Sequence, residues 1–297
     1  MTQTQQTEQT PHRTWLITGA TSGIGRALAE AALDAGENVV GTARRIERFT
    51  GWTEPHGGDR FLPVAHDVRD TDAAAAVVAQ GIERFGGIDV LVNNAGVGQV
   101  GAAEEVSDDQ LRDMLAQHLF GPAALVRAVL PAMRATGRGA IVQVSSQGGR
   151  MSFPGAGSYS AGKFALEGWS EALAGEVRGF GIRVLIVEPS RFRTGFNDDD
   201  VLLNATESEA YDQVLGAVRT ELRSVAGSQE GDPVRGAGII REVLALPETP
   251  LRLPLGAEAV RNLAEAYRQG IAELDRTTAF AEAADFPDAP PSQRAFR

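Results

Sequence analysis

The sequence predicts a single α/β domain built on a doubly wound parallel sheet with helices on both faces. Short apolar runs alternate with longer amphipathic segments from residue 13 to about residue 190, which is the rhythm of strand–helix–strand units. Several of these runs are nearly continuous in Val, Ile and Leu, as in strands that are covered on both faces. No internal repeat and no linker rich in Pro or Gly marks a second domain.

The expected elements follow this alternation in chain order. The strands are Thr14–Thr18, Asn38–Thr42, Phe61–His66, Asp89–Asn93, Ala140–Ser145 and Arg183–Glu188, with Leu251–Leu255 as a last strand. The helical stretches include Arg26–Ala35, Asp108–Arg134 and Gly157–Phe180, and a final helix covers Ala257–Asp275. We therefore expect the domain to cover residues 13–275.

Both ends of the chain are expected to be tails. Residues 1–12 are polar and lack the basic start and apolar core of a signal peptide, so they read as disordered. Residues 276–297 form a C-terminal extension, loosely attached from Asp285 onward, where three prolines follow.

The segment 190–233 breaks the alternation after the sixth strand. It is polar and carries three consecutive aspartates from Asp198. Ligands of such sheets bind beyond the carboxyl ends of the strands, so this long excursion is a candidate lid. The alternative is a solvated surface insertion.

Composition excludes several classes of function. A formal net charge of −11 without any basic run argues against nucleic acid and anionic membrane surfaces as partners. The absence of cysteine excludes disulfides and thiolate metal sites, and the four histidines are scattered, so no metal centre is expected. No apolar stretch is long enough to span a membrane. We expect a cytoplasmic protein that binds small molecules.

A glycine-rich loop follows the first strand. The sequence Gly19-Ala20-Thr21-Ser22-Gly23-Ile24-Gly25 runs from the strand into a helix. Its three glycines allow a tight turn and let backbone amides close on a pyrophosphate at the helix N-terminus. A glycine triplet alone is often only a turn, but the strand before it and the helix after it indicate a dinucleotide site.

The end of the second strand indicates which dinucleotide binds. An NAD site places an acidic side chain there to bond the ribose 2′-hydroxyl. This chain has Ala43 followed by Arg44 and Arg45, and arginine matches a 2′-phosphate in charge and geometry. The sequence therefore predicts NADP(H) as cofactor, the alternative being an ordinary solvated basic loop.

Lys163 is the only lysine among the 28 lysine and arginine residues, and it comes four residues after Tyr159. An ammonium is a compact charge that can sit against a phenol and a sugar hydroxyl, whereas arginine is a wide planar fork. An ammonium one helical turn from Tyr159, together with a positive nicotinamide ring, would favour the phenolate, so we expect a lowered pKa for that phenol. The alternative is a surface pair of no consequence.

Together these motifs resemble the classical short-chain dehydrogenase/reductase family. The pattern runs from Thr18 to Gly25, through Asp67-Val68 and Asn93-Asn94-Ala95-Gly96, to Ser146 thirteen residues before Tyr159, and ends at Lys163. The resemblance covers about residues 13–260 and implies a Rossmann-type domain in a longer member of the family. It also implies a homodimer or homotetramer that pairs through the helices at 108–134 and 157–180.

The resemblance implies a role for each matching residue. Tyr159 would be the general acid/base, Ser146 would hold the substrate oxygen, and Lys163 would grip the nicotinamide ribose. Asp67 and Val68 would flank the adenine. The remaining cofactor contacts would be Asn93, Ala95 and Gly96 on the adenosine side, with Pro189 and Thr194 near the carboxamide or phosphates.

The sequence departs from the family pattern at two positions. His118 stands where the family has an asparagine whose bound water connects the lysine to solvent. It could hold that water, relay a proton, or be a structural residue satisfied by a backbone carbonyl. Ser190 follows Pro189 where glycine is usual, which could restrict the backbone near the nicotinamide or crowd the ring.

The function expected is an NADP-dependent oxidoreductase that interconverts a secondary alcohol and a ketone. Epimerisation or elimination with a bound nucleotide stays open, as does a regulator without turnover, although the intact Ser146, Tyr159 and Lys163 disfavour the regulator. A partly apolar substrate is expected, in a pocket lined by Gln147, Gly148, Phe153, Phe196 and the lid.

Overall fold

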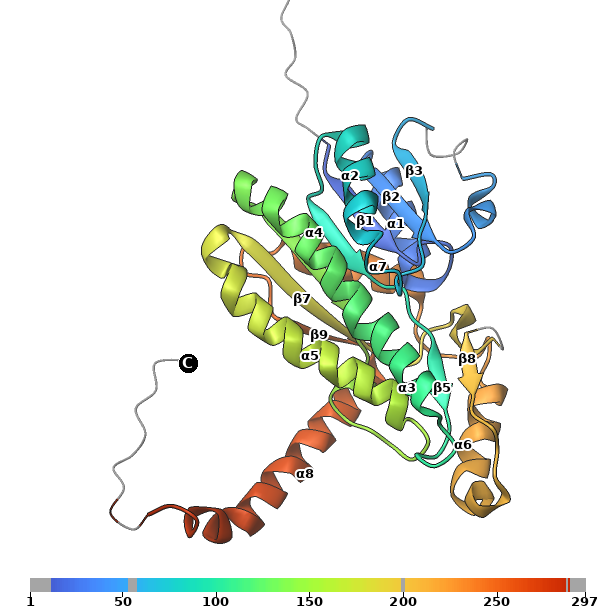
Figure 1. Ribbon diagram of the computed structural model, residues 1–297, viewed down its shortest axis with the longest axis vertical. Helices are drawn as coiled ribbons and strands as arrows, with labels where there is room; N and C mark the ends of the chain where they lie inside the picture. The colour runs from blue at the N-terminus through green and yellow to red at the C-terminus, as the bar shows by residue number, and fades with distance from the viewer. Residues whose placement is uncertain (1–11, 53–57, 199–200, 287, 289–297) are drawn as a thin grey trace, which may run out of the picture.

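The computed structural model describes residues 12–52, 58–198, 201–286 and 288. Its core is a seven-stranded sheet in the order β3-β2-β1-β4-β6-β7-β9, in which every neighbouring pair is parallel (Figure 1). The strands are β1 Thr14–Thr18, β2 Asn38–Ala43, β3 Phe61–Ala65, β4 Val90–Asn93, β6 Gly139–Val144, β7 Ile182–Pro189 and β9 Arg252–Leu255. The strand order reverses between β1 and β4, which is where such sheets bind ligands. The predicted fold class is confirmed.

Helices cover both faces of the sheet because successive strand residues point to opposite sides. Trp15 and Ile17 of β1 enter one apolar layer, and Leu16 enters the other. The first layer is covered by α1 (Gly23–Asp34) and α7 (Pro233–Ala245). The second is covered by α2 (Ala74–Phe85), α4 (Gly121–Thr136) and α5 (Gly157–Val177).

The helix predicted over 108–134 is divided in three. After α3 (Asp108–Leu115) the chain makes one π-helical turn, η2, over Ala116–Phe120, and α4 then begins at Gly121. A Cβ added at Gly121 would lie 2.2 Å from the Val68 carbonyl oxygen, so this end of α4 packs against backbone. Single π-turns of this kind concentrate at functional sites, and this one carries His118.

The polar excursion after β7 contains regular secondary structure among its described residues. Its strand β8 (Leu202–Asn204) pairs in parallel with β5 (Gly98–Val100), and α6 (Asp212–Ser224) lies beyond this pair at one end of the molecule (Figure 1). Arg219 of α6 donates to Glu105 across 2.7 Å, and the two side chains are only 4% and 2% exposed. This buried ion pair fastens the predicted lid to the loop after β5, a pairing that sequence periodicity did not indicate.

The last helix is longer than predicted. α8 spans Ala257–Glu282 and projects from the body of the molecule (Figure 1), so the boundary expected at 275/276 falls inside it. Of the two expected tails, residues 1–11, 287 and 289–297 lie outside the described residues. Among the described helices, none combines the length and the apolar character of a membrane span.

Candidate active site

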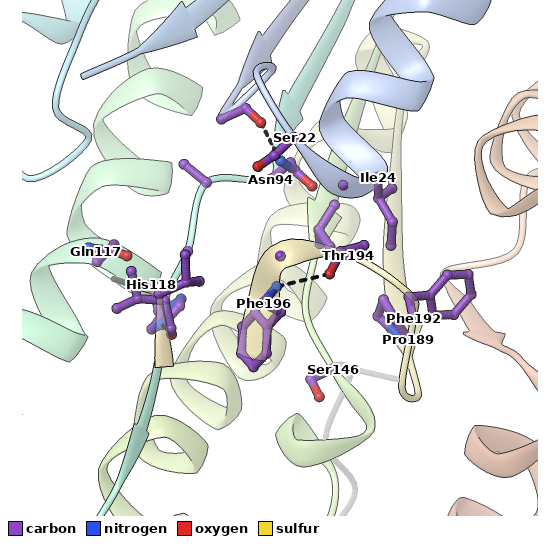
Figure 2. A pocket seen from close by; sticks show the side chains of 18 of the residues that line it. Ser22, Ile24, Asn94, Gln117, His118, Ser146, Pro189, Phe192, Thr194 and Phe196 are labelled. Carbon is purple, nitrogen blue, oxygen red and sulfur yellow. Dashed lines mark hydrogen bonds between the residues drawn. The ribbon is translucent and has the colours of Figure 1, made fainter. Parts of the chain in front are cut away.

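A pocket of about 350 Å³ opens at the carboxyl ends of the central strands. Figure 2 shows side chains from the glycine loop, the π-turn and the segment after β7 converging on it. The predicted site residues that line it are Gly19, Thr21, Ser22, Gly23, Ile24, Arg44, Arg45, Asp67, Val68, Ala95, Gly96, His118, Ser146, Gln147, Phe153, Tyr159, Lys163, Pro189, Thr194 and Phe196. Residues spread over 178 positions of sequence therefore border one cavity, from Gly19 to Phe196.

The glycine loop has the shape that a pyrophosphate needs. Gly19 and Gly23 adopt φ of +63° and +57°, which other residues rarely reach. A Cβ on Gly19 would lie 2.9 Å from Ala95 Cα, and one on Gly23 would lie 3.0 Å from Thr194 Cγ2. Ser22 begins α1 without capping it through its side chain, so the first amides of α1 face the pocket end of the helix. This cradle fits a dinucleotide.

Two predicted contacts lie behind the pocket instead of along it. Gly25 is buried where a Cβ would lie 2.3 Å from Asn94 Nδ2. Asn93 is buried and donates through Nδ2 to Gln143 Oε1 across 3.0 Å. The residue that lines the pocket is Asn94, whose Nδ2 donates to the carbonyls of Thr18 and Gly19 across 2.9 and 3.2 Å. Asn94 was visible in the motif, but its spacing gave no sign of this bracing of the glycine loop.

The adenosine end of the pocket is basic. Arg44, Arg45 and Arg48 are exposed and border it, and Arg48 was not anticipated from the sequence. The carboxylate of Asp67 is held by Arg69, with Nη2 to Oδ2 at 2.6 Å. This hydrogen bond with Arg69 holds the pKa of Asp67 below its usual value. Asp67 is therefore ionised and fixed in orientation at the edge of the cavity.

Tyr159 and Lys163 lie one turn apart on α5 and both line the pocket, where Lys163 is buried and Tyr159 is half-buried. The Lys163 Nζ is 5.8 Å from the centre of the Tyr159 ring and donates to the Val144 carbonyl across 2.9 Å. Ser146 follows β6, and its hydroxyl accepts from the Gly148 amide across 3.0 Å. A Cβ on Gly148 would lie 3.2 Å from the Tyr159 ring and 3.3 Å from Ser146 Oγ. Gly148 therefore lies close to both the Tyr159 ring and the Ser146 hydroxyl.

Burial sets the proton affinities of this pair. Desolvation raises the pKa of Tyr159 to about 12, while the Ser146 hydroxyl acts in the opposite direction. Desolvation also lowers the pKa of Lys163 to about 7, and the negative charge of Glu167 opposes it. In the chain by itself burial therefore outweighs the other effects on the Tyr159 phenol. The lowering expected from the ammonium together with the nicotinamide ring stays a prediction.

His118 is held inside the π-turn and is 1% exposed. Its Nε2 lies 2.9 Å from the Val97 carbonyl oxygen, and a carbonyl only accepts, so Nε2 carries the hydrogen. Nδ1 is buried without a partner among the described residues, and the ring meets Tyr159 edge-on with 5.5 Å between centroids. Burial, reinforced by Lys163, lowers the pKa of His118 well below its usual value. The imidazole is therefore neutral.

Ser190 fits its place without strain. Its amide donates to the Leu255 carbonyl across 3.0 Å, and positive φ among the described residues is confined to glycine. The restriction that the missing glycine could have imposed is therefore absent from this backbone. Four residues further on, Thr194 accepts from the Phe196 amide across 3.2 Å and lies against Gly23.

The substrate side of the pocket is largely apolar. Phe196 packs edge-on against Tyr159 with 6.0 Å between ring centroids, and Phe153 is 45% exposed at the rim. Sequence reasoning missed several lining residues because they lie in α6, in the turn after β7 or directly before β5 and β8, and only the tertiary structure gives their positions. These are Val97, Asn197, Val201 and Leu222.

Comparison with known proteins gives a consistent result. A family model described as short chain dehydrogenase matches residues 13–202. The oxidoreductase BOA17 of Botryotinia fuckeliana is 40% identical over 83% of this chain and 89% of its own length. The 3-ketodihydrosphingosine reductase of Bacteroides thetaiotaomicron is 43% identical over 66% of this chain and 70% of its own length.

Solved structures agree. A short-chain dehydrogenase from Streptomyces avermitilis is 45% identical with a TM-score of 0.86, covering 92% of this chain and 98% of that one. A metagenomic short-chain oxidoreductase in complex with NADP is 27% identical with a TM-score of 0.64, covering 82% of this chain and 96% of that one. A Burkholderia phymatum protein in complex with NAD, 23% identical with a TM-score of 0.72, shares the fold over 95% of this chain and 98% of its own.

Proposed function

This chain belongs to the short-chain dehydrogenase family, and from that membership we propose that it is an NADP-dependent oxidoreductase that interconverts a secondary alcohol and a ketone. One observation carries the proposal. Ser146, Tyr159 and Lys163 border the same pocket as the glycine cradle. A phenol, a hydroxyl and an ammonium therefore meet beside the place where a dinucleotide fits.

The chain's own residues would manage the proton. The bound dinucleotide supplies hydride transfer. Ser146 holds the substrate oxygen by hydrogen bond, and Tyr159 gives that oxygen a proton in reduction or removes one in oxidation. With a pKa of about 12, Tyr159 keeps its proton at neutral pH, which is the form that reduction of a ketone requires. Lys163 supplies a positive charge beside the phenol when it is protonated.

The choice of NADP rests on the basic end of the pocket. Arg44 and Arg45 follow Ala43 at the end of β2 and border the cavity, and no carboxylate stands at residue 43 to bond a free 2′-hydroxyl. A guanidinium bonds a phosphate in a fork geometry, through charge-assisted hydrogen bonds. The NADP complex of a relative supports this reading for this chain.

His118 would serve Lys163 through its free nitrogen. A Cβ on Gly96 would lie 3.3 Å from His118 Nδ1 and 3.7 Å from Lys163 Nζ, so both atoms face the same small space. With Nε2 donating to Val97, Nδ1 can only accept. We therefore assign His118 as the acceptor that holds a relay water, with no imidazolium formed.

The substrate is expected to be a partly apolar ketone or alcohol. The apolar walls contributed by Phe153, Phe196 and Leu222 support this class. A relative named as a 3-ketodihydrosphingosine reductase also acts on a ketone.

Assembly and location belong to the same proposal. A homodimer or homotetramer would pair through the helices at 108–134 and 157–180, and the exposure of Phe120 and Phe164, 52% and 45%, supports burial there by a second copy. A cytoplasmic location is proposed as well. Light scattering of the unmutated chain and of Phe164→Glu tests the assembly, since a monomer in both cases contradicts it.

A direct assay tests the activity. The purified chain is incubated with NADPH and a panel of ketones of increasing apolar size, and loss of the reduced nicotinamide absorbance is followed. Turnover by the unmutated chain, abolished in Tyr159→Phe while NADPH binding persists, supports the proposal. Bound NADPH with no turnover on any ketone or alcohol would instead favour a nucleotide-binding regulator.

A further inference from the structure

A cluster of buried charges lies behind the Tyr159–Lys163 pair. Glu167 comes one helical turn after Lys163 on α5, and Glu188 is the penultimate residue of β7; they are 3% and 1% exposed. Arg252 Nε lies 3.0 Å from Glu167 and 3.7 Å from Glu188. Arg150 Nη1 lies 3.3 Å from Glu188 and 4.0 Å from Glu167. Two guanidinium groups thus hold two carboxylates that no proposed step of the reaction uses.

The cluster is built into the active-site segments. A Cβ on Gly149 would lie 3.0 Å from Glu167 Cγ, 2.6 Å from Ser145 Oγ and 3.2 Å from the Lys163 carbonyl oxygen. The Glu167 side chain therefore packs between the helix that carries Lys163 and the loop that carries Ser146. Arg150 extends the cluster to α8, where it stacks on Tyr267 at 5.1 Å. Burial of this carboxylate carries a desolvation cost, which its ion pairs with Arg252 and Arg150 offset.

We propose that Glu167 is a positioning residue for the reaction, which keeps Lys163 in its ammonium form beside Tyr159 while Arg150, Arg252 and Glu188 fix its carboxylate. The expected effect of Glu167 on turnover rests on the proposed function. Its expected effect on the protonation of Lys163 does not, because that is a property of the chain alone. A negative charge one turn from a buried ammonium favours the charged form at (i, i+4) spacing.

The surrounding charges support this assignment. The groups facing Glu167 and Lys163 are Glu171 on α5, Arg150 after η3 (Gln147–Gly149), Glu188 on β7, Arg252 on β9, Tyr267 on α8 and His118 on η2. Of these neighbours His118 is neutral. Burial and the neighbouring Glu167 raise the pKa of Glu188 above its usual value. The negative charge of Glu167 opposes the lowering of the Lys163 pKa that burial causes.

The lone lysine makes the test direct. In a chain expressed with isotope-labelled lysine and no lysine in its tag, Lys163 gives the single lysine side-chain NMR signal, and its titration midpoint is read from that signal. We expect Glu167→Gln to lower the midpoint by about one pH unit, a tenfold loss in proton affinity. The basic limb of the pH–rate profile for ketone reduction should move in the same direction.

Glu171→Gln is the matched control. Glu171 also contacts Arg252, at 2.6 Å, and lies on the same helix, but its side chain is 62% exposed. Its removal should leave the Lys163 midpoint where it is. Should Glu167→Gln fail to fold, Glu167→Asp repeats the test, because it withdraws the charge from Lys163 and should lower the midpoint by a smaller amount.

An unchanged midpoint in the folded Glu167 variant, or an equal fall in Glu171→Gln, overturns the assignment. Because the midpoint is measured without substrate, it separates this inference from the activity itself. A shifted midpoint in a chain that reduces no ketone would uphold the electrostatic role and refute only the proposed reaction.

Discussion

The imidazole of His118 is fixed by a single hydrogen bond, 2.9 Å from Nε2 to the Val97 carbonyl oxygen. That bond decides the tautomer, because the carbonyl can only accept. It also turns Nδ1 toward the space shared with the Lys163 ammonium. The sequence left three roles open for His118: holding a water, relaying a proton, or a structural role. The backbone carbonyl satisfies Nε2, as in the structural role, but Nδ1 remains an acceptor that can hold the proposed relay water.

The first prediction tests this acceptor. His118→Asn should keep most of the activity, because an amide oxygen also accepts, whereas His118→Leu should lower turnover by at least about tenfold. Because the pKa of His118 lies well below its usual value, the unmutated protein should show no imidazole ionisation near neutral pH.

Steady-state rates and pH–rate profiles of the three proteins check both parts. Equal activity in all three proteins would show that His118 is only structural. An ionisation near neutral pH that disappears in His118→Asn would instead show that the imidazole carries protons.

The second prediction concerns the choice of lysine at residue 163. Lys163→Arg should lower turnover by at least about tenfold although the charge is preserved, because the fork cannot reproduce the position of an ammonium that donates to Val144. Tyr159→Phe should be worse still, with cofactor binding largely intact. Single-turnover measurements with NADPH separate binding from chemistry, and near-normal rates in Lys163→Arg would refute our interpretation of the lone lysine.

The third prediction concerns the cofactor. The unmutated protein should bind NADPH more tightly than NADH. Arg44→Ala or Arg45→Ala should reduce the difference in binding free energy between the two nucleotides by about 1–3 kcal/mol, because a charge-assisted contact is lost. Isothermal titration with both nucleotides measures this directly. Arg112→Ala is a suitable control, since Arg112 lies on α3, is exposed and pairs with Asp108 and Asp109. Equal affinity for the two nucleotides would end the NADP assignment.

The fourth prediction concerns stability as a function of pH. Lys163 has a pKa of about 7 in the folded chain and 10.5 as its ordinary value, so the unfolded chain binds more protons between these pH values. The cost of burying Lys163 is therefore complete below about pH 7 and disappears as the pH rises toward 10.5.

Lys163→Met removes this cost while leaving the Val144 carbonyl without its donor. The variant should be inactive, yet more stable than the unmutated chain by at least about 1 kcal/mol at pH 6, with the advantage declining as the pH rises to about 10. Urea unfolding at a series of pH values measures the difference in free energy of unfolding. A constant difference across that range would mean that Lys163 is not desolvated in the folded protein.

The fifth prediction concerns the lid. Arg219→Met should raise the KM for the ketone more than it lowers kcat, because the variant leaves buried Glu105 without its cation and loosens α6 from the loop after β5. The dissociation constant of NADPH should be unchanged, since the glycine cradle lies elsewhere in the pocket. A proportional loss of NADPH affinity would show that Arg219 supports the whole fold.

The sequence by itself determined the parallel sheet and the residues that line its switch point. Continuous apolar strands fix the layers, since both faces of a parallel sheet must be covered. The glycines at 19 and 23 indicated a tight turn, and both adopt positive φ. The spacing of Tyr159 and Lys163 predicted that they lie one turn apart on a helix, as they do on α5. These features are local or periodic, so they can be read from neighbouring residues.

Only the tertiary structure decided what depends on distant partners. The tautomer of His118 is set by Val97, 21 residues away, and the lid is fastened through Arg219 and Glu105, 114 residues apart. The direction in which the pKa of Tyr159 is shifted in the chain itself is likewise set by burial. Desolvation depends on how much of the chain surrounds a group, and no spacing of charges along the sequence reveals that burial.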